Sequence, residues 1–475
     1  MARRSHPARS LAVQLLRQLE QGERTAFSNR LLDDAFTKHP QGKRLDRRDR
    51  ALVTTLVYGV LRHRARLDAL IDAVAHNPAR LRGRIRVILR LAALELRELD
   101  RPPHVAISEA QSATRKLDPT GKLGRVTQAL LSEIVRRGEE LDAAHEQLAP
   151  AKALYRRWSI PRWLARRWVD PAAGLGPERA LRRAQALSRP CSIDLRVDLS
   201  RTSRERVLEA LREDAEDPAR AGKLRCEAPE SLTLADGRVV PQPQLLRVIS
   251  GGQLAKHPLH TRGLFSIQAL GSQQAVRVLD PQPGERVLDV CAGLGTKTLQ
   301  LAEHMQRRGV LVATDTNAAR LSAHAELGSR GGLVDATSSG ALTVIRALAD
   351  MATPEPVPEV DAGDEGYDRV LLDAPCTGLG NLARHPEARW TTRPEDIEEC
   401  AALQRRLLKR CWTRVRPGGR LVYAVCSLEP EEGPTLVEEF VRARASSATL
   451  LEQQRWTPET HACDGFYLAA LTRAH

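Results

Sequence analysis

Apolar residues recur at helical spacing through the first third of the chain. In SLAVQLLRQLEQG and RALVTTLVYGVLRHRARLDALIDAVA they fall at positions i, i+3, i+4 and i+7, the spacing of an amphipathic α-helix. The stretches HPQGK, NPAR, DRPPH and DPTGK interrupt this pattern with residues that favour turns. The pattern therefore predicts an all-α domain over residues 1–146.

The pattern changes twice after that. Within residues 147–255, PCSIDLRVDLS and SLTLADGRVV alternate as strands do, and SRERVLEALRED has helical spacing. We expect a small α+β middle domain or linker there. Within residues 256–475, the segments ERVLDVCAG, GVLVATDTN, GLVDAT, YDRVLLDAPC and GGRLVYAVCS are strand candidates, most of them followed by helical segments. This alternation predicts an α/β, Rossmann-like domain with an open parallel sheet and helices on both faces.

Composition agrees with a multidomain soluble protein. The chain has 475 residues, of which 42% are hydrophobic and 28% charged, and this length is too great for one ordinary domain. No apolar run approaches the roughly 18 residues of a membrane span, and the Arg-rich N-terminus has no long apolar segment of the kind found in signal peptides. We therefore expect a cytoplasmic protein without a membrane partner, and a monomer by default.

Positive charge is concentrated in the N-terminal third. The whole chain carries a net charge of +14, and residues 1–150 contain 28 Lys and Arg against 18 Asp and Glu, which is +10. Such a balance favours a polyanionic partner such as nucleic acid, although a solvated basic face in an Arg-rich protein is equally plausible. Two clusters, GKRLDRRDR (42–50) and RHRAR (62–66), flank one predicted helix and are candidates for an RNA-binding face.

A third basic stretch, RRWSIPRWLARRW, holds Trp158, Trp163 and Trp168 among five arginines. Interleaved Arg and Trp suit stacking on unpaired bases. An amphipathic helix that packs its aromatic side against a neighbouring domain explains the same pattern, and we favour that interpretation slightly.

Cysteine usage excludes two classes of site. The eight cysteines contain no CxxC pair, so neither a metal site nor, in a reducing compartment, a disulfide framework is expected. The cysteines are therefore core thiols or reactive thiols.

The segment ERVLDVCAGLGTKTLQLAEHM predicts a strand, a glycine-containing turn and a helix. Gly293 and Gly295 let the backbone approach a ligand, and the next predicted strand ends at Asp315, where such folds place an acid against ribose hydroxyls. Position 298 is Thr, so the full dinucleotide-binding pattern is absent, and a methyltransferase site for S-adenosyl-L-methionine is favoured, with adenine near Asp335. The expected cofactor-binding residues are Cys291, Ala292, Gly293, Leu294, Gly295, Thr296, Lys297, Asp315, Asp335 and Asp373.

Two predicted strands end in cysteines, Cys376 and Cys426. Parallel strands point their carboxyl ends at one edge of a sheet, so both thiols can face one pocket. Either thiol alone would be interpreted as structural. Together beside a methyl donor they suit methylation of cytosine at C5, in which a thiolate adds at C6 and a carboxyl group such as Asp373 assists protonation at N3. A second thiol assists product release.

These residues lie in motifs that resemble the bacterial 16S rRNA cytosine-C5 methyltransferases of the RsmB (Sun/Fmu) type. LLDAPCTGLGNLARHPEARW is similar to the family's DAPCS-G-x-x-RRHP-x-x-x-W motif, LVYAVCSLEPEEG to LVYATCS-x-x-PEEN, and CDGFYLAAL to its DGFFYA ending. PPHVAISEA resembles a segment of the NusB RNA-binding fold, so the resemblance implies that the all-α domain is NusB-like. The likeness covers nearly the whole chain.

The resemblance implies a reaction and roles. The substrate would be 16S rRNA, in an unfolded or loop region, at a cytosine 967-type site. Cys426 would attack C6, Cys376 would help release the product, and Asp373 would contact the base near the cofactor. The cofactor loop departs from the family's CAAPGGKT, because this chain reads CAGLGTKT. Further departures are Ala269 for Asp, Val425 for Thr and Gly433 for Asn.

Two alternatives stay open. The substrate is tRNA or another rRNA site in the first. In the second, the chain is a non-catalytic NusB-like RNA-binding factor for ribosome assembly that has lost cofactor binding through the altered loop.

Overall fold

The computed structural model describes residues 6–21, 28–172, 174–216, 224–250, 254–333, 341–353, 355, 357–361 and 363–475. Contacts divide the chain into two compact units. The first unit is Met1–Pro190 with Leu382–Thr392, and the second is Cys191–Asn381 with Arg393–His475. Within the described ranges, no helix is long and apolar enough to cross a membrane.

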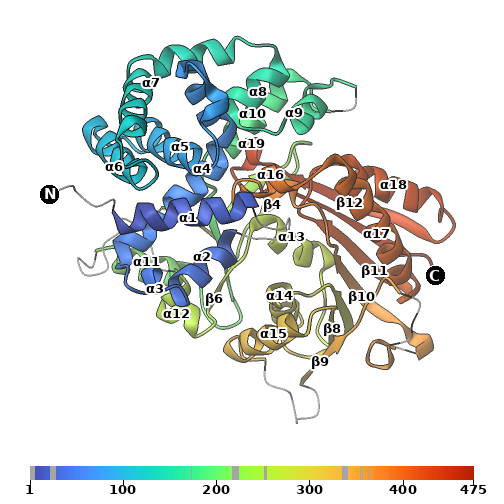
Figure 1. The fold of residues 1–475 in the computed structure, drawn as a ribbon. Helices are drawn as coiled ribbons and strands as arrows, with labels where there is room; N and C mark the ends of the chain where they lie inside the picture. Colours follow the sequence, from blue (N-terminus) through green and yellow to red (C-terminus); the bar gives the residue numbers. More distant parts are fainter. Residues whose placement is uncertain are drawn as a thin grey trace. The chain divides into compact units, whose positions relative to one another are not determined.

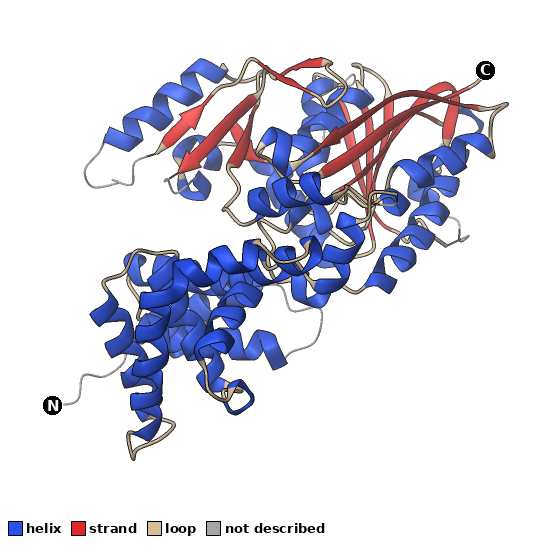
Figure 2. Ribbon diagram, turned by 90° about the horizontal axis from the view of Figure 1, so that it is seen from above, coloured by secondary structure: helices blue, strands red, loops and turns tan. Residues whose placement is uncertain are grey.

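The first unit is helical, which confirms the predicted all-α domain. Figure 2 shows the described strands only in the second unit. The helices of the first unit are α1 (Pro7–Gln21), α2 (Ser28–Thr37), α3 (Pro40–Lys43), α4 (Arg47–Val74), α5 (Arg84–Arg97), α6 (Pro103–Arg115), α7 (Lys122–Glu146), α8 (Pro150–Trp158), α9 (Arg162–Val169), α10 (Pro177–Leu187) and α16 (Ala388–Thr391), with a 3-10 turn at Pro78–Arg80.

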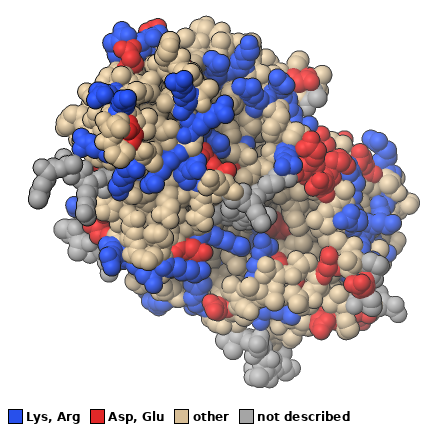
Figure 3. Space-filling view, in the orientation of Figure 1, with Lys and Arg blue, Asp and Glu red and all other residues tan. Residues whose placement is uncertain are grey.

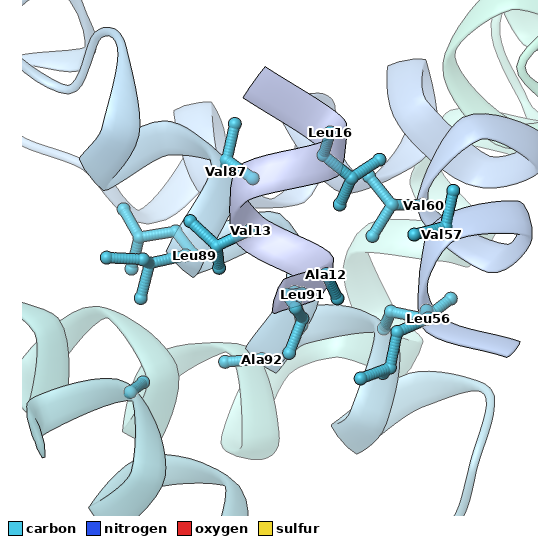
Figure 4. Packing of buried hydrophobic residues seen from close by; sticks show 14 of the residues in the cluster. Ala12, Val13, Leu16, Leu56, Val57, Val60, Val87, Leu89, Leu91 and Ala92 are labelled. Atoms are coloured by element: carbon cyan, nitrogen blue, oxygen red, sulfur yellow. The ribbon is translucent and has the colours of Figure 1, made fainter. Parts of the chain in front are cut away.

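The core of this unit lies between α1, α4 and α5. Their apolar faces interdigitate in Figure 4, which labels members of one buried cluster. Leu56 and Val60 of α4 are four residues apart and therefore point to the same side of the helix, where both are at most 1% exposed. Burial of a side chain of this kind contributes about 1.5–3 kcal/mol, so this shared face holds the three helices together.

The basic cluster at 62–66 is largely internal, contrary to the prediction of a free RNA-binding face. α4 runs continuously through it, so the two basic clusters do not flank a helix. Arg66 is 4% exposed and donates to the Asp142 carboxylate of α7 at 2.8 and 2.5 Å. Arg62 donates to the Ala383 carbonyl at 2.8 Å. These arginines hold the protein's own backbone and carboxylates.

Tryptophans of the third basic stretch also pack inside the helical unit. Trp168 is 3% exposed, with the Arg183 guanidinium 5.6 Å from its ring centroid. Trp158 is half-buried and has Arg157 over its ring at 4.5 Å. Trp168 is therefore packed rather than exposed to RNA bases, although its partner Arg183 lies in the same unit and not in a neighbouring domain.

The second unit contains the sheets (Figure 1). Its strands are β1 (Ile193–Val197), β2 (Arg225–Glu227), β3 (Ser231–Thr233), β4 (Val239–Pro241), β5 (Leu245–Ser250), β6 (Phe265–Ile267), β7 (Arg286–Val290), β8 (Gly309–Asp315), β9 (Leu342–Leu348), β10 (Tyr367–Asp373), β11 (Val415–Val425), β12 (Ala448–Trp456) and β13 (Phe466–Arg473). Its helices are α11 (Arg204–Glu216), α12 (Pro258–Thr261), α13 (Leu270–Leu279), α14 (Thr296–His304), α15 (Ala318–Arg330), α17 (Pro394–Thr413), α18 (Pro434–Arg442) and α19 (Pro458–His461).

The large sheet has the order β12-β13-β11-β10-β7-β8-β9. The strands β11, β10, β7, β8 and β9 are parallel, whereas β13 and β12 pair in the antiparallel sense. Alternate residues of β11 enter different cores: Leu421 and Tyr423 lie in one cluster with α17 and α18 residues, and Val422 in another with α13 and α14 residues. Helices therefore cover both faces, which confirms the predicted Rossmann-like architecture.

The small sheet has the order β2-β5-β1-β6 and is antiparallel where the pairing is described. Arg196 of β1 joins it to α14 inside the second unit, because this 1%-exposed side chain forms an ion pair with Glu303 and donates to Gln268 at 2.6 Å. The small sheet thus has a buried hydrophobic cluster of its own within the second unit.

Two parts of the sheet differ from the sequence-based prediction. The third parallel strand along the chain, which lies at the edge of the sheet, is β9. The segment GLVDAT, which was predicted to form the third strand, lies mostly outside the described residues. The antiparallel pair β12 and β13 was not predicted. The division of the chain at 146/147 and 255/256 stays a prediction, since one contact unit can hold more than one domain.

The segment Leu382–Thr392 belongs to the helical unit although second-unit sequence flanks it on both sides. Trp390 Nε1 donates to the Leu61 carbonyl of α4 at 2.7 Å. The Glu387 carboxylate accepts from the Ser28 amide of α2 at 3.2 Å. The chain therefore leaves the second unit a few residues after Cys376, is held by α2 and α4, and returns at Arg393.

Arg389 is the most deeply held side chain of this segment, at 1% exposure. Its guanidinium donates to the carbonyls of Leu187 at 2.6 Å and Arg62 at 3.0 Å, with longer bonds to Trp158 and Ser159. Trp158 and Leu187 end α8 and α10, so the cation satisfies carbonyls that helix ends leave open. Burial lowers the pKa of Arg389 to about 9. This value still lies above neutral pH, so the side chain stays protonated.

Replacement of Arg389 by Met should loosen the helical unit. The change leaves buried carbonyls without a donor, which costs roughly 3 kcal/mol, so amides at the ends of α8 and α10 should lose protection in hydrogen exchange of the full chain. Arg136→Met on α7 is the control, because Arg136 is 67% exposed and pairs with the nearby Glu133 of the same helix. Equal protection in both variants and the wild type would contradict a stabilising role for Arg389.

Candidate active site

The two predicted thiols follow neighbouring strands. β10 and β11 pair in parallel, with Asp373 opposite Ala424. The chain continues past both strands at the same edge of the sheet, so Cys376 and Cys426 lie side by side. Their Sγ atoms are 3.3 Å apart, and both side chains are half-buried. The structure thus brings together the pair that the sequence placed 50 residues apart.

A buried carboxylate joins the two thiol loops. Glu432 is 0% exposed and accepts from the Thr377 amide at 2.8 Å, the Thr377 hydroxyl at 2.5 Å and the Ser427 hydroxyl at 2.5 Å. Thr377 directly follows Cys376, and Ser427 directly follows Cys426. Burial raises the pKa of Glu432, while these hydrogen bonds oppose that rise. Glu432 was not predicted as a site residue, although it lies in the PEEG segment shortly after Cys426.

A glycine brings the same loop against the Cys426 backbone. Gly380 donates its amide to the Cys426 carbonyl at 3.0 Å and accepts from the Gly465 amide at 2.8 Å. A Cβ atom at position 380 would lie 2.2 Å from the Gly465 carbonyl oxygen and 2.8 Å from that of Cys426. Only glycine permits this approach. The loop that carries Cys376 is therefore held at Gly380 as well as at Thr377.

The Cys376 thiol is held in its protonated form. The hydrogen bond with Cys426, followed by burial, raises the pKa of the Cys376 thiol well above its ordinary value, and Glu432 adds to this rise. Because the thiolate is the nucleophilic form of cysteine, the raised pKa disfavours Cys376 as a nucleophile at neutral pH. As a thiol it can donate a hydrogen bond to the Cys426 sulfur.

Asp373 ends β10 and forms an ion pair with Lys297 of α14, whose Nζ lies 2.6 Å from a carboxylate oxygen. β10 lies between β11, which leads to Cys426, and β7, which leads to the glycine turn. The Lys297–Asp373 ion pair therefore lies between the end of β11, which leads to Cys426, and the end of β7, which leads to the glycine turn. The structure brings together two residues, Asp373 and Lys297, that the sequence predicted separately.

The glycine turn is held by Asp315 at the end of β8. Its carboxylate accepts from the Gly293 amide and the Asn317 amide, both at 2.9 Å. Asp315 is 4% exposed, and Ala292 donates its amide to the Thr314 carbonyl at 2.8 Å. The turn is thus fixed against the neighbouring strand by Asp315, whose predicted contact with ribose hydroxyls stays a prediction.

The turn uses left-handed backbone at Cys291 (φ 61°), Gly293 (φ 60°) and Gly295 (φ 87°). A Cβ on Gly295 would lie 2.3 Å from the His324 ring, whereas a Cβ on Gly293 would meet only one carbonyl oxygen, at 4.0 Å. Thr296 follows Gly295 as the first residue of α14. Gly293 therefore leaves its side of the turn open.

A buried chain of hydrogen bonds supports the turn from below. Arg346 Nε donates to His324 Nδ1 at 2.9 Å, so His324 Nε2 carries the hydrogen and donates to Thr298 Oγ1 at 2.9 Å. Thr298 in turn donates to Asp289 at 2.6 Å. Burial lowers the pKa of His324 to about 4 and raises that of Asp289 to about 7. His324 and Arg346 were not predicted, since nothing in their local sequence marks them.

The remaining predicted residues have different positions. Leu294 is 58% exposed at the tip of the turn. Burial raises the pKa of the Cys291 thiol well above its ordinary value, and the side chain packs partly against the core at the end of β7. Asp335 lies outside the described residues. Among the departures from the family pattern, Val425 is fully buried in β11, and Ala269 precedes α13 without a side-chain cap.

Comparisons with known proteins identify the family to which the chain belongs. Residues 276–472 match the family model described as 16S rRNA methyltransferase RsmB/F, and residues 6–136 match the NusB family. The chain is 30% identical to the probable ribosomal RNA small subunit methyltransferase B of Synechocystis sp., over 98% of this chain and 99% of that protein. It is 31% identical to ribosomal RNA small subunit methyltransferase B of Shewanella oneidensis, over 90% and 91%.

A solved structure supports the fold. The crystal structure of PH0851 aligns with a TM-score of 0.72 over 99% of this chain and 100% of its own, at 24% identity. The sequence matches carry the family assignment: this chain belongs to the ribosomal RNA small subunit methyltransferase B family, with a NusB-type helical domain and a Rossmann-like methyltransferase domain.

Proposed function

We propose that the chain is an S-adenosylmethionine-dependent methyltransferase that forms 5-methylcytosine in 16S rRNA, at a site of the cytosine 967 type, through a covalent bond between Cys426 and C6 of the base. The observation that carries this proposal is the pair of thiols, with Sγ atoms 3.3 Å apart, at the ends of adjacent parallel strands. Methyl transfer to a more nucleophilic atom would need neither thiol.

The turn residues fit the cofactor. Gly293 leaves open space beside the turn, and the Asp315 carboxylate uses two of its roughly four acceptor positions on backbone amides, which leaves the others for ribose hydroxyls. Cys291 to Lys297, Asp315 and Asp373 would hold S-adenosylmethionine, with Asp335 near the adenine. The bound cofactor supplies an electrophilic methyl group.

Cys426 begins the reaction as a thiolate. Its sulfur forms a bond to C6, the C5=C6 π pair shifts to C4=C5, the C4=N3 π pair moves onto N3, and N3 takes a proton. Asp373 is paired with Lys297, so we assign delivery of that proton to the Lys297–Asp373 pair. The adduct gives C5 the electron density that an unmodified cytosine lacks, and C5 becomes the methylated atom.

Product release reverses the covalent step. The C5 proton leaves to a base, its bonding pair forms the C5=C6 double bond again, the bond from C6 to sulfur breaks with its pair on the Cys426 sulfur, and N3 gives up the proton that it took. The raised pKa of Cys376 keeps its proton, and the 3.3 Å contact lets that thiol stabilise the departing sulfur. The target base must be unstacked for this attack, which favours a loop or unfolded RNA. A monomeric state and a cytosolic location stay predictions.

Replacement of Cys426 by Ala should abolish activity. With labelled S-adenosylmethionine and protein-free 16S rRNA, the wild type should form 5-methylcytosine, and the variant should be at least about a thousandfold slower, as expected when a nucleophile is removed. Cys226→Ala in the small sheet is the control and should retain the wild-type rate. Equal rates for the Cys426 variant and the wild type would remove Cys426 as nucleophile. The alternative of a non-catalytic factor predicts no transfer by the wild type and no thermal shift with S-adenosylmethionine.

Replacement of Cys376 by Ala should trap the covalent intermediate, because the adduct forms but its breakdown lacks the assisting thiol. The measurement is a denaturing gel, in which a protein–RNA complex should survive for this variant and be absent for Cys376→Ala/Cys426→Ala. If no complex survives in the single variant while methylation continues at the wild-type rate, Cys376 has no part in release.

Glu432→Gln should slow turnover without weakening cofactor binding. The amide cannot accept from Thr377 and Ser427 as the carboxylate does, so the two thiol loops lose their common support. A small misplacement costs on the order of 10- to 100-fold in kcat, while KM for S-adenosylmethionine should stay within about twofold. Glu438→Gln on the exposed face of α18 is the control. A parallel rise in the cofactor KM would point to general unfolding instead of thiol positioning.

A further inference from the structure

A basic hollow lies between α8 and α9 of the helical unit. It measures 290 Å³, and its lining includes Lys152, Arg156, Arg162 and Arg166. Lys152 and Arg156 are four residues apart on α8, and Arg162 and Arg166 are four residues apart on α9, so each pair shares one helix face. All four side chains are exposed. Like charges at this spacing weaken a helix, so the arrangement gains from an anion.

Acidic residues do not offset this charge. The lining contains no Asp or Glu, and across the described ranges none of the four cations forms an ion pair. A larger hollow of 560 Å³ in the same unit differs, because Glu20 and Asp72 share its lining with five arginines. There Arg86 pairs with Asp72 at 2.6 Å. Lys and Arg are frequent on the visible face of the helical unit in Figure 3. Those that line the α8–α9 hollow form no ion pair with a carboxylate of the described residues.

The hollow also contains an aromatic surface. Tyr155 of α8 lines it, and the Arg162 guanidinium lies 4.7 Å from the Tyr155 ring centroid. The neighbouring Trp158 and Trp168 have other contacts, since Arg157 and Arg183 lie over their rings. A planar cation on an aromatic ring beside further cations is the combination that binds unpaired nucleotides, with phosphates on the cations and a base on the stack.

We propose that the α8–α9 hollow binds the sugar–phosphate backbone of single-stranded RNA, with Lys152, Arg156 and Arg166 at phosphates and the Arg162–Tyr155 stack against a base. The site would hold a strand of the substrate RNA, so this inference rests on the proposed function for its biological meaning. The binding itself can be tested without methyl transfer.

The test uses the full chain and a fluorescent single-stranded RNA of about one dozen mixed nucleotides, with binding measured by anisotropy over a series of KCl concentrations. Arg162→Ala/Arg166→Ala should raise Kd about tenfold or more at 0.1 M KCl. Each phosphate contact on a single strand contributes about 0.7 to the slope of log Kd against log salt. Of the two replaced arginines only Arg166 lies at a phosphate, so the slope should fall by about 0.7, while the loss of Arg162 removes the stack. Arg136→Ala/Arg137→Ala on α7 removes the same charge from arginines that pair with Glu133 and Glu140.

The control should bind RNA within about twofold of the wild type, with an unchanged slope. If both double variants weaken binding equally, only the total charge matters and the proposal fails. An unchanged Kd for Arg162→Ala/Arg166→Ala also overturns it, and would leave an acidic protein as the ligand to consider. A wild-type chain that shows the RNA effects but transfers no methyl group would overturn the proposed function and leave this inference intact.

Tyr155 provides a second variant that does not change charge. Tyr155→Phe keeps the ring and should bind RNA as the wild type does, whereas Tyr155→Leu keeps bulk without the ring and should weaken binding by at least about fivefold. The salt slope should stay constant in both, because no phosphate contact is lost. Equal affinity of the Phe and Leu variants would remove the stacking role.

Discussion

The parallel pairing of β10 with β11 on one side and β7 on the other is the constraint on which the site depends. It fixes which residues emerge together at the carboxyl edge of the sheet: Cys376 and Cys426 from one pair of strands, and Asp373 beside the turn after β7 from the other. A shift of one residue in the β10–β11 register would exchange the faces of every side chain in the strand. The cores on both faces resist such a shift, because β11 sends alternate residues into each of them. The packing that fixes the register of β11 therefore also fixes the positions of the reactive side chains at the edge of the sheet.

Arginine has two separate roles in the helical unit. Arg66, Arg90 and Arg389 are less than 10% exposed and bind the protein's own carboxylates or carbonyls. Those of the α8–α9 hollow are exposed and form no ion pair with any residue that the structure describes. Net charge counts both kinds equally, so it overstates the surface available to RNA. The distinction also explains why a basic cluster such as 62–66 can be structural while shorter pairs on α8 and α9 are free to bind a ligand.

Local patterns in the sequence predicted much of the fold and the centre of the site. Helical spacing identified the first unit, and the strand–helix alternation identified the parallel sheet, because both are determined by which faces are buried. The strand β9 and the antiparallel β12–β13 pair were missed, since their pairing depends on neighbours distant in sequence. Cys376, Cys426, Asp373 and Lys297 were found because they lie at strand ends or in a glycine turn. Glu432, His324 and the buried carbonyls that Arg389 binds were not found. Each of these groups acts through hydrogen bonds to residues that are distant in the sequence and meet only in the fold.

The central claim is that Cys426, and not its neighbour 3.3 Å away, forms the bond to the base. The most direct measurement is to digest the RNA complex of the Cys376→Ala chain with nuclease and protease and locate the modified residue by mass spectrometry. The account predicts a nucleotide attached to the peptide that contains Cys426, and no attached nucleotide in the Cys426→Ala chain. A nucleotide found on Cys376 of the Cys426→Ala chain, with methylation retained, would reverse the assigned roles and contradict the account.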